Sequence, residues 1–206
     1  LPGARHDDAP AGEKRSLSSI LAQPLYLTAV LAGLVAYGVM AFIMTATPVS
    51  MHVIDHFTLR ETAWVIQSHI LAMFVPSLFT GSLIGRFGLT RIMMTGTLLM
   101  TACAAIALVD RHFAHYWTGL VLLGVGWNFL FVGGTTLLTK CYRPEDRFRA
   151  QATNDFIVFG FQAIASLSAG AVIFNAGWEV LNGLSLPLLA LMLAVIMRMR
   201  RGIEAP

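Results

Sequence analysis

The sequence predicts an all-α membrane protein whose six transmembrane helices form two inverted repeats of three. Three observations lead to this prediction: an excess of apolar residues, six apolar runs of membrane-spanning length, and basic residues clustered on alternate connections. Hydrophobic residues make up 56% of the 206 residues and charged residues only 12%, whereas a soluble domain carries about a quarter charged residues. We therefore expect lipid to be the solvent of most of this surface.

Six segments have the roughly 20 apolar residues that a helix needs to cross a bilayer. They are Leu25–Val49, Ala63–Ile84, Ile92–Val109, Tyr116–Thr139, Ala152–Phe174 and Val180–Met197. The connections are short, so consecutive helices are expected to be antiparallel. Interior prolines such as Pro48, Pro76 and Pro187 are tolerated in membrane helices, because neighbouring groups satisfy the backbone atoms that a proline leaves free.

Polar residues and prolines fill the stretch before the first run, and we interpret residues 1–23 as a cytoplasmic linker. The six-helix bundle is expected over residues 24–201, followed by a short cytoplasmic tail over residues 202–206. The chain begins with Leu1 rather than Met, so we expect a further segment to precede it.

The basic residues predict the orientation, because Lys and Arg concentrate on the cytoplasmic side of membrane proteins. With the amino terminus in the cytoplasm, only Arg60 and Arg111 of the fourteen basic residues fall on the outer side. We expect a multi-pass protein of the inner (plasma) membrane with both ends of this segment in the cytoplasm. The same clustering between apolar runs argues against a nucleic-acid partner despite the net charge of +3.

Polar side chains follow a pattern of two striped helices and then an apolar one. The third and sixth runs hold few polar groups, whereas the other four carry polar stripes at helical spacing, such as Asp155, Phe159, Gln162 and Ser166. Polar groups in a span tend to face a bundle interior or a wet cavity, so the striped helices are expected to surround a pathway. Each triplet contains an odd number of spans, so the second triplet would enter the membrane from the opposite side and be inverted relative to the first. The pattern alone does not exclude a bundle that simply has apolar peripheral helices.

The connection between the second and third runs reads GSLIGRFGLTR. It resembles the cytoplasmic loop signature G-x-L-x-D-R-x-G-x-x-R of the major facilitator superfamily of transporters. Five positions match: Gly81, Leu83, Arg86, Gly88 and Arg91. Gly85 stands where the family has Asp, so the family's carboxylate contact to a neighbouring helix cannot form from that position. The signature is commonly weaker in the second half of such proteins, which suggests a carboxyl-terminal six-helix half.

The resemblance covers residues 22–201 and implies alternating access, in which two six-helix bundles rock about a site near the membrane midplane. It implies that this chain is half of a secondary active transporter, proton-coupled and not an enzyme. The expected partners are the lipid bilayer, an amino-terminal six-helix half that this chain lacks, a small-molecule substrate and protons. The spans contain no Lys or Arg, so a neutral or amphipathic substrate is expected rather than an anion.

Several residues in the striped runs are candidates for function. Those for the substrate pathway are Tyr37, Met44, His69, Asn128 and Gln162, and those for proton coupling or a gate are His69 and Asp155. A histidine can titrate near neutral pH, but His69 could equally serve as a hydrogen-bonding group between helices. Asp155 could simply stabilise a helix amino terminus, and the amides could bind neighbouring helices.

No metal site and no cofactor are predicted. The sequence contains no Rossmann glycine fingerprint, phosphate-binding loop or heme-binding cysteine motif, and we interpret Cys103 and Cys141 as free thiols. Histidines and an aspartate in two outer loops could assemble a metal site if the loops meet. Polar residues are also expected in any loop that is exposed to water. The residues in question are His52, Asp55, His56, His112 and His115.

Two other classes of function stay open. A self-standing six-helix protein could dimerise to complete a pathway or act as a membrane scaffold. A remoter alternative is an intramembrane serine hydrolase that uses Ser166 or Ser168 with the distant His69, although a nucleophilic serine needs a base beside it.

Overall fold

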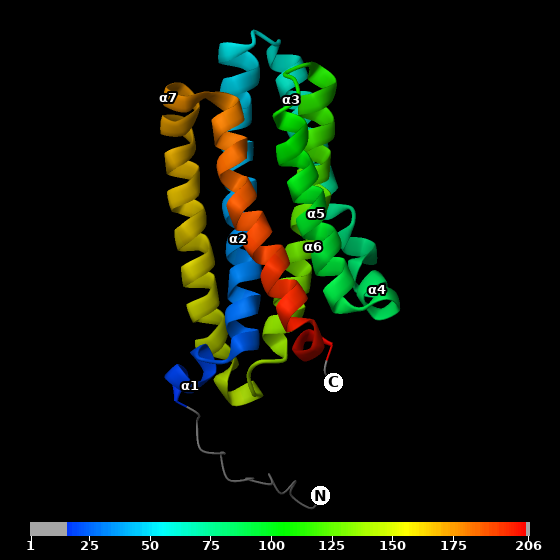
Figure 1. The fold of residues 1–206 in the computed structure, drawn as a ribbon, viewed down its shortest axis with the longest axis vertical. Coiled ribbons are helices and arrows are strands. Elements are labelled where there is room, and N and C mark those ends of the chain that lie inside the picture. Colours follow the sequence, from blue (N-terminus) through cyan, green and yellow to red (C-terminus); the bar gives the residue numbers. More distant parts are fainter. Residues whose placement is uncertain (1–15, 205–206) are drawn as a thin grey trace, which may run out of the picture.

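The computed structural model describes residues 16–204, and every regular element in that range is helical. The helices form an elongated bundle, with α1 and the carboxyl-terminal end of α7 at the same end (Figure 1). We call this the terminal end and the opposite one the distal end. The all-α membrane fold is confirmed. Residues 1–15 of the predicted linker and 205–206 of the predicted tail lie outside the described residues.

The elements follow the predicted runs closely. In order they are α1 (Leu17–Leu21), α2 (Pro24–Pro48), the π-helical turn η1 (Val49–Ile54), α3 (Leu59–Phe74), α4 (Ser77–Phe87), α5 (Leu89–Ala107), α6 (Phe113–Thr139), the 3₁₀ turn η2 (Pro144–Asp146) and α7 (Arg147–Ile203). Thr58 starts α3 with a capping box, in which its hydroxyl accepts from the Glu61 backbone N–H and the Glu61 carboxylate accepts from that of Thr58.

Within the described residues, four helical stretches are long and apolar enough to cross a membrane. They are Pro24–Ile54, Leu89–Ala107, Phe113–Thr139 and Pro144–Ile203, and the pair α3 and α4 makes a fifth if it is one span bent by 45°. The predicted second span is therefore not one straight helix. Pro76 has no N–H to donate, and the helix is interrupted between Phe74 and Ser77.

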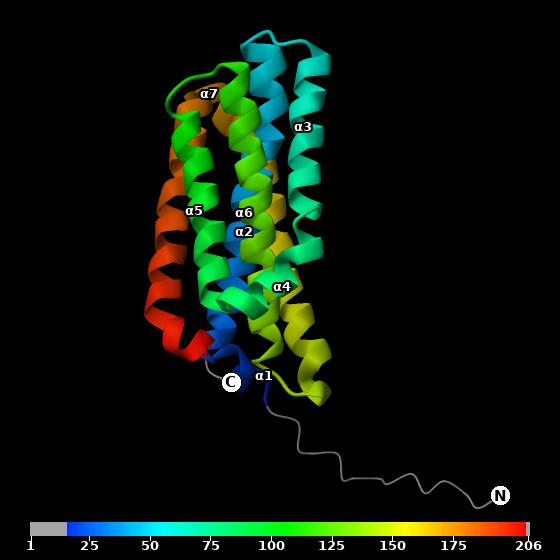
Figure 2. The same ribbon diagram turned by 90° about the vertical axis from the view of Figure 1, so that its right-hand side faces the viewer.

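The last stretch consists of two arms. Its 60 residues would make a helix of roughly 90 Å, about three times the thickness of the bilayer core. Gly177 interrupts it with a φ of 85° and a ψ of 175°, a conformation that glycine adopts without steric cost. The chain runs to the distal end along residues 147–176 and returns along residues 178–203 (Figures 1 and 2). The arms coincide with the predicted fifth and sixth runs, while the number of six crossings itself stays a prediction.

Glycines bring α6 into backbone contact with its neighbours. A Cβ atom on Gly96 would lie 2.7 Å from the Leu130 nitrogen and 2.8 Å from the Gly126 oxygen, and one on Gly124 would lie 2.7 Å from the His69 oxygen. Small residues allow such close approach between membrane helices, where burial of apolar area adds little because lipid is equally apolar. Helix α6 is thus fixed against both α5 and α3.

We predict that Gly96→Ala lowers the thermal stability of the detergent-solubilised protein by about 1–3 kcal/mol, because the new methyl group meets backbone atoms that cannot move aside. The matched control is Gly183→Ala, whose Cβ would have no atom within 4 Å. It should leave stability unchanged or raise it by up to about 1 kcal/mol through helix propensity. Equal melting temperatures for the two variants would contradict the close packing of α5 on α6.

Candidate functional site

Five aromatic side chains from α2, α3, α6 and the first arm of α7 form one contiguous group, which we call the aromatic cluster. Its members are Tyr37, Phe74, Trp127, Phe131 and Phe159. The Tyr37 ring meets Trp127, Phe131 and Phe159 edge-on, with centroid distances of 5.2, 4.9 and 5.3 Å. Trp127 stacks on Phe131 at 5.1 Å, and Phe74 meets Trp127 at 6.2 Å. These distances and angles are those at which aromatic rings attract one another.

The aromatic cluster lies near the middle of the long axis of the bundle. Tyr37 and Trp127 are near the centres of their helices, Phe74 stands at the break between α3 and α4, and Phe159 is near the centre of the first α7 arm. In a spanning bundle this is the level of the bilayer midplane. Trp127 is only 4% exposed, while Phe74 is 59% and Phe159 49% exposed. We call the buried Trp127 the enclosed floor of the cluster, and the exposed Phe74 and Phe159 its open edge.

The enclosed floor contains an unused hydrogen-bond donor. The indole Nε1–H of Trp127 is shielded from solvent and has no partner among residues 16–204. Buried polar groups in proteins are nearly always hydrogen-bonded, and an indole N–H can only donate. The arrangement thus combines aromatic faces with one donor, which suits a flat aromatic molecule that carries an acceptor atom.

Asn128, a predicted pathway residue, is fully engaged within the protein. Its side chain is 1% exposed, and its Nδ2 donates to the Met73 carbonyl at 2.8 Å and to the Ser77 hydroxyl at 2.6 Å. Its Oδ1 accepts from the Thr80 hydroxyl at 2.6 Å. These bonds join α6 to both sides of the interruption at Pro76. In this conformation Asn128 holds the bent segment, and its role in the pathway stays a prediction.

His69 is also enclosed, with none of its surface exposed. Its Nδ1 lies 2.8 Å from the Leu120 carbonyl, which can only accept, so Nδ1 carries the proton. In the neutral ring Nε2 is then an acceptor, and it has no partner among the described residues. His69 thus joins α3 to α6 through one ring nitrogen and leaves the other without a partner among the described residues.

The remaining predicted residues lie on the two helices that carry Tyr37 and Phe159. Asp155 is exposed and accepts from the Asn154 amide at 3.0 Å, and Gln162 is half-buried without a hydrogen bond to another described residue. They stand four residues before and three after Phe159, on the same face of the helix. Met44 is half-buried two turns beyond Tyr37 on α2.

Sequence reasoning missed Phe74 and Phe131 as site residues, and it used Phe159 only as part of a stripe. Within an apolar segment, the sequence does not distinguish an aromatic residue that faces lipid from one that faces a pathway. Only the packing of four helices shows which rings meet.

In the loop signature, Gly88 has a clear conformational requirement. It ends α4 and precedes α5 with a φ of 89°. The neighbouring Thr90 N–H donates to the Glu204 carboxylate at 3.0 Å, at the amino terminus of α5. In contrast, Cβ atoms on Gly81 and Gly85 would meet nothing within 4 Å. Neither glycine makes a close contact within the described residues, because both lie on the exposed side of α4.

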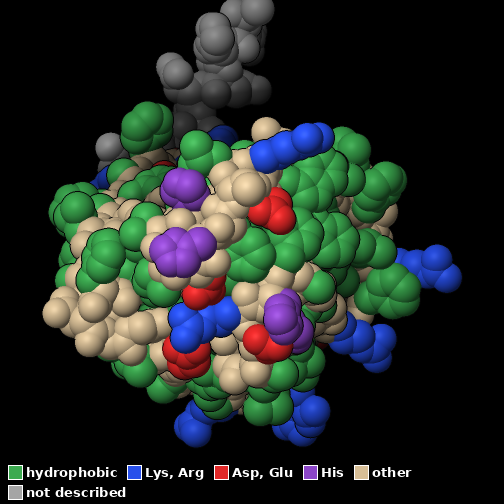
Figure 3. All heavy atoms as spheres, turned by 90° about the horizontal axis from the view of Figure 1, so that it is seen from above, with side chains coloured by type: hydrophobic (Ala, Val, Ile, Leu, Met, Phe, Trp, Pro, Cys, Tyr) green, Lys and Arg blue, Asp and Glu red, His purple; other side chains and the backbone are tan. Residues whose placement is uncertain are grey.

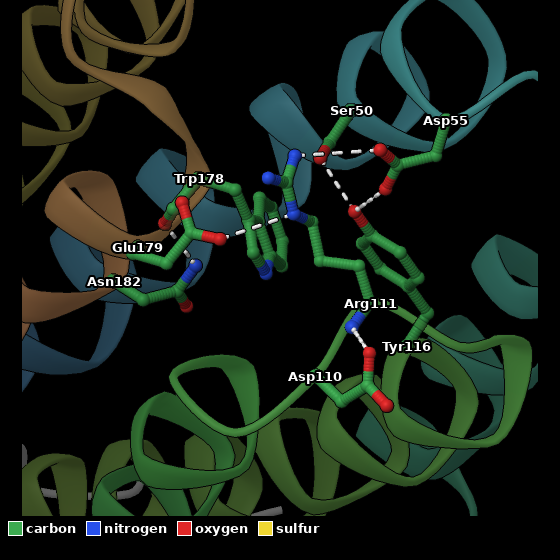
Figure 4. A network of polar contacts seen from close by, with 8 residues as sticks. All are labelled: Ser50, Asp55, Asp110, Arg111, Tyr116, Trp178, Glu179 and Asn182. Atoms are coloured by element: carbon green, nitrogen blue, oxygen red, sulfur yellow. Dashed lines mark hydrogen bonds and ion pairs between the residues drawn. The ribbon is translucent and has the colours of Figure 1, made fainter.

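At the distal end, charged side chains tie three connections together. The Arg111 guanidinium lies 3.3 Å from an Asp55 oxygen and 3.0 Å from a Glu179 oxygen (Figure 4). The Tyr116 hydroxyl donates to Asp55 at 2.8 Å and lies 2.5 Å from the Ser50 hydroxyl. Figure 3 shows histidine and acidic side chains gathered with a basic one on this end of the bundle.

The distal histidines do not assemble into a metal site in the described part of the chain, where no group of three metal-ligating side chains occurs. His52 Nδ1 instead lies 2.8 Å from the Phe57 carbonyl. The serines considered for a hydrolase have other partners. Ser166 shares a hydrogen bond with Thr45 at 3.0 Å, and Ser168 donates to the Ala165 carbonyl at 2.9 Å, so neither is paired with His69.

Comparison with known proteins gives three relatives and one family. The sequence profile of the Major Facilitator Superfamily matches residues 25–206. Riboflavin transporter RfnT of Brucella anthropi is 43% identical over 204 residues, which cover 97% of this chain and 49% of the relative. The uncharacterized MFS-type transporters YddS and YdeG of Bacillus subtilis are 36% and 32% identical over 81% and 80% of this chain, in each case 38% of the relative. The chain thus spans half or less of the length of these relatives.

We predict that Asn128→Leu destabilises the protein by about 1–3 kcal/mol, because the Met73 carbonyl loses its donor in a region without water. Thermal unfolding in detergent measures the change. Thr135→Val on the same helix is the control, since the exposed Thr135 hydroxyl bonds only to its own helix. An Asn128→Leu protein of unchanged stability would contradict the structural role and would favour direct contact with substrate.

Proposed function

Because this chain belongs to the Major Facilitator Superfamily, we propose that it forms one six-helix half of a membrane transporter for a flat heteroaromatic molecule of the flavin type. The observation that carries the proposal is the aromatic cluster, with its unpartnered Trp127 N–H, at mid-height beside a broken helix. Substrate sites of such transporters lie near the midplane where helices are discontinuous. The 43% identity to a riboflavin transporter supports the choice of substrate.

The chemistry of a flavin matches this surface part by part. Its fused rings are flat and aromatic, so they can pack against Tyr37 and Phe74. Its carbonyl oxygens and ring nitrogens accept hydrogen bonds, which the Trp127 N–H can donate. Its neutral polyol chain both donates and accepts, and Asp155 and Gln162 lie beside Phe159 to receive it. A flavin without phosphate also agrees with the expectation of a neutral or amphipathic substrate.

A second protein surface is needed to cover the open edge of the aromatic cluster. Phe74 and Phe159, at its two sides, are about half exposed, and a bound flavin would otherwise leave one face in water. We propose that an amino-terminal six-helix half closes this side, with residues 1–23 as the linker and residues 24–201 as the bundle. Alternating access would then open the site to each side of the inner membrane in turn.

Proton coupling is part of the proposal. The lone pair of His69 Nε2 has no partner among the described residues, and Asp155 is a carboxylate exposed on the face of the first α7 arm that carries Phe159. Either group could gain a proton on one side of the membrane and lose it on the other.

We predict that the natural protein containing this chain restores growth of a riboflavin-auxotrophic bacterium at low riboflavin and takes up labelled riboflavin. Trp127→Phe keeps an aromatic ring but removes the N–H, so the apparent KM should rise about threefold to tenfold, the worth of one neutral hydrogen bond. The matched control is Trp117→Phe on the same helix, because the Trp117 N–H already bonds to Ser68 at 3.0 Å.

Three outcomes would count against parts of the proposal. Absence of riboflavin flux with the protein present in the membrane would reject the substrate. Equal KM values for the two tryptophan variants would reject the aromatic cluster as the site. Uptake that is unaffected by a protonophore, and by His69→Gln and Asp155→Asn, would reject proton coupling.

We predict the orientation to be terminal end inside and distal end outside. In a background without Cys103 and Cys141, a membrane-impermeant maleimide should label Arg60→Cys in intact cells and should label Glu145→Cys only after lysis. Both positions are exposed, so access alone decides the result. The native thiols should react poorly in any case, because both are buried and burial raises the pKa of the Cys141 thiol to about 11. The reverse labelling pattern would overturn the orientation.

A further inference from the structure

A groove of about 800 Å³ lies at the terminal end, between the α4–α5 connection and the end of α7. We call it the basic groove. Its charged lining consists of Arg86, Arg91, Arg200, Arg201 and Glu204. Arg86, Gly88 and Arg91 belong to the loop signature, so the groove adjoins that motif. It is separate from the aromatic cluster, which lies at mid-height and involves neither α4 nor α5.

The charges in the basic groove are strongly unbalanced. Four arginines against one glutamate give a formal charge of +3. Glu204 is already engaged, since it accepts from the Thr90 N–H at 3.0 Å. None of the four guanidinium groups forms an ion pair or hydrogen bond with another described residue. The Arg86 guanidinium only lies over the Phe87 ring, 5.3 Å from its centroid. Planar guanidinium groups are well suited to bind phosphate with two parallel hydrogen bonds.

The surroundings of the basic groove indicate where a phosphate would come from. Its arginines stand at the ends of α4 and α7 and the start of α5, which is the level of the lipid headgroups in a spanning bundle. Beyond it toward mid-height, the apolar helix α5 and the second arm of α7 expose Leu98, Leu191 and Met197, each about half exposed. A ligand with a phosphate at one end and acyl chains at the other fits both parts.

We propose that the basic groove binds the phosphate of an anionic phospholipid from the cytoplasmic leaflet, with the acyl chains along α5 and the second arm of α7. Basic pockets between membrane helices on the cytoplasmic side are suited to such headgroups. The bound lipid would link the loop signature to the end of α7. Glu204 covers the amino terminus of α5, so the phosphate is held by the arginine side chains and not by that helix end.

Binding of dioctanoyl phosphatidylglycerol to the natural full-length protein in detergent, measured by native mass spectrometry, tests the proposal. Arg91→Gln with Arg200→Gln should weaken binding about 30-fold, from roughly 1 kcal/mol for each arginine near the surface. Glu204→Gln keeps an acceptor for Thr90 but removes a negative charge, so it should strengthen binding about fivefold. The matched control is Arg143→Gln with Arg149→Gln, two exposed arginines of the same end outside the groove.

The comparison ligands separate the possible sources of the phosphate. Dioctanoyl phosphatidylcholine should bind at least tenfold more weakly, and inorganic phosphate should not displace the anionic lipid at millimolar concentration. Equal binding of the two lipids would overturn the proposal. Displacement by inorganic phosphate would replace it with a site for free phosphate. An equal loss of lipid binding in the control variant would indicate nonspecific attraction to surface charge and would also overturn the proposal. Melting temperatures of all variants establish that each is folded.

Discussion

The rest of the structure depends on the hydrogen bonds that the Asn128 amide makes across the interruption between α3 and α4. Lipid offers no partner for a free carbonyl, so a helix can be broken within the membrane only where the protein supplies one. Asn128 supplies it to Met73 and bonds to Ser77 beyond the proline. The break places Phe74 against Trp127 and bends α4, which carries the first part of the loop signature, by 45° from α3.

The two ends of the bundle are fixed in different ways. At the distal end, Arg111 joins Asp55 and Glu179, so the connection after α5 is tied both to η1 and to the second α7 arm. At the terminal end the bonds run mainly to backbone atoms: Tyr26 donates to the Ala150 carbonyl at 2.9 Å, and Lys140 to the Ile203 carbonyl at 3.3 Å. Between these ends α6 contacts its neighbours through glycines, aromatic rings and the hydrogen bonds of Asn128, without charged pairs among the described residues.

The loop signature illustrates how tertiary structure can supply what a motif lacks. Gly85 replaces the family's aspartate, so this position offers no carboxylate. Glu204, more than a hundred residues later, brings a carboxylate to the amino terminus of α5. There it accepts a hydrogen bond from the Thr90 N–H and interacts favourably with the positive end of the α5 dipole. Nothing in the local sequence around Gly85 indicates this contact, because it is made by the end of a helix that is distant in the chain.

The sequence by itself determined the solvent, the helical segments and the family of this protein. Apolar length and composition are local properties, and a membrane makes helix the favoured structure for any such segment. It also identified His69, Asn128 and Asp155 as polar groups within or beside spans. Only the tertiary structure decided what surrounds them. The Asn128 amide makes its hydrogen bonds across the helix break, His69 Nε2 has no partner among the described residues, and Asp155 is exposed. The aromatic cluster and the basic groove were likewise decided there, because each is built from side chains on separate helices, and residue spacing within one helix cannot specify which faces of different helices meet.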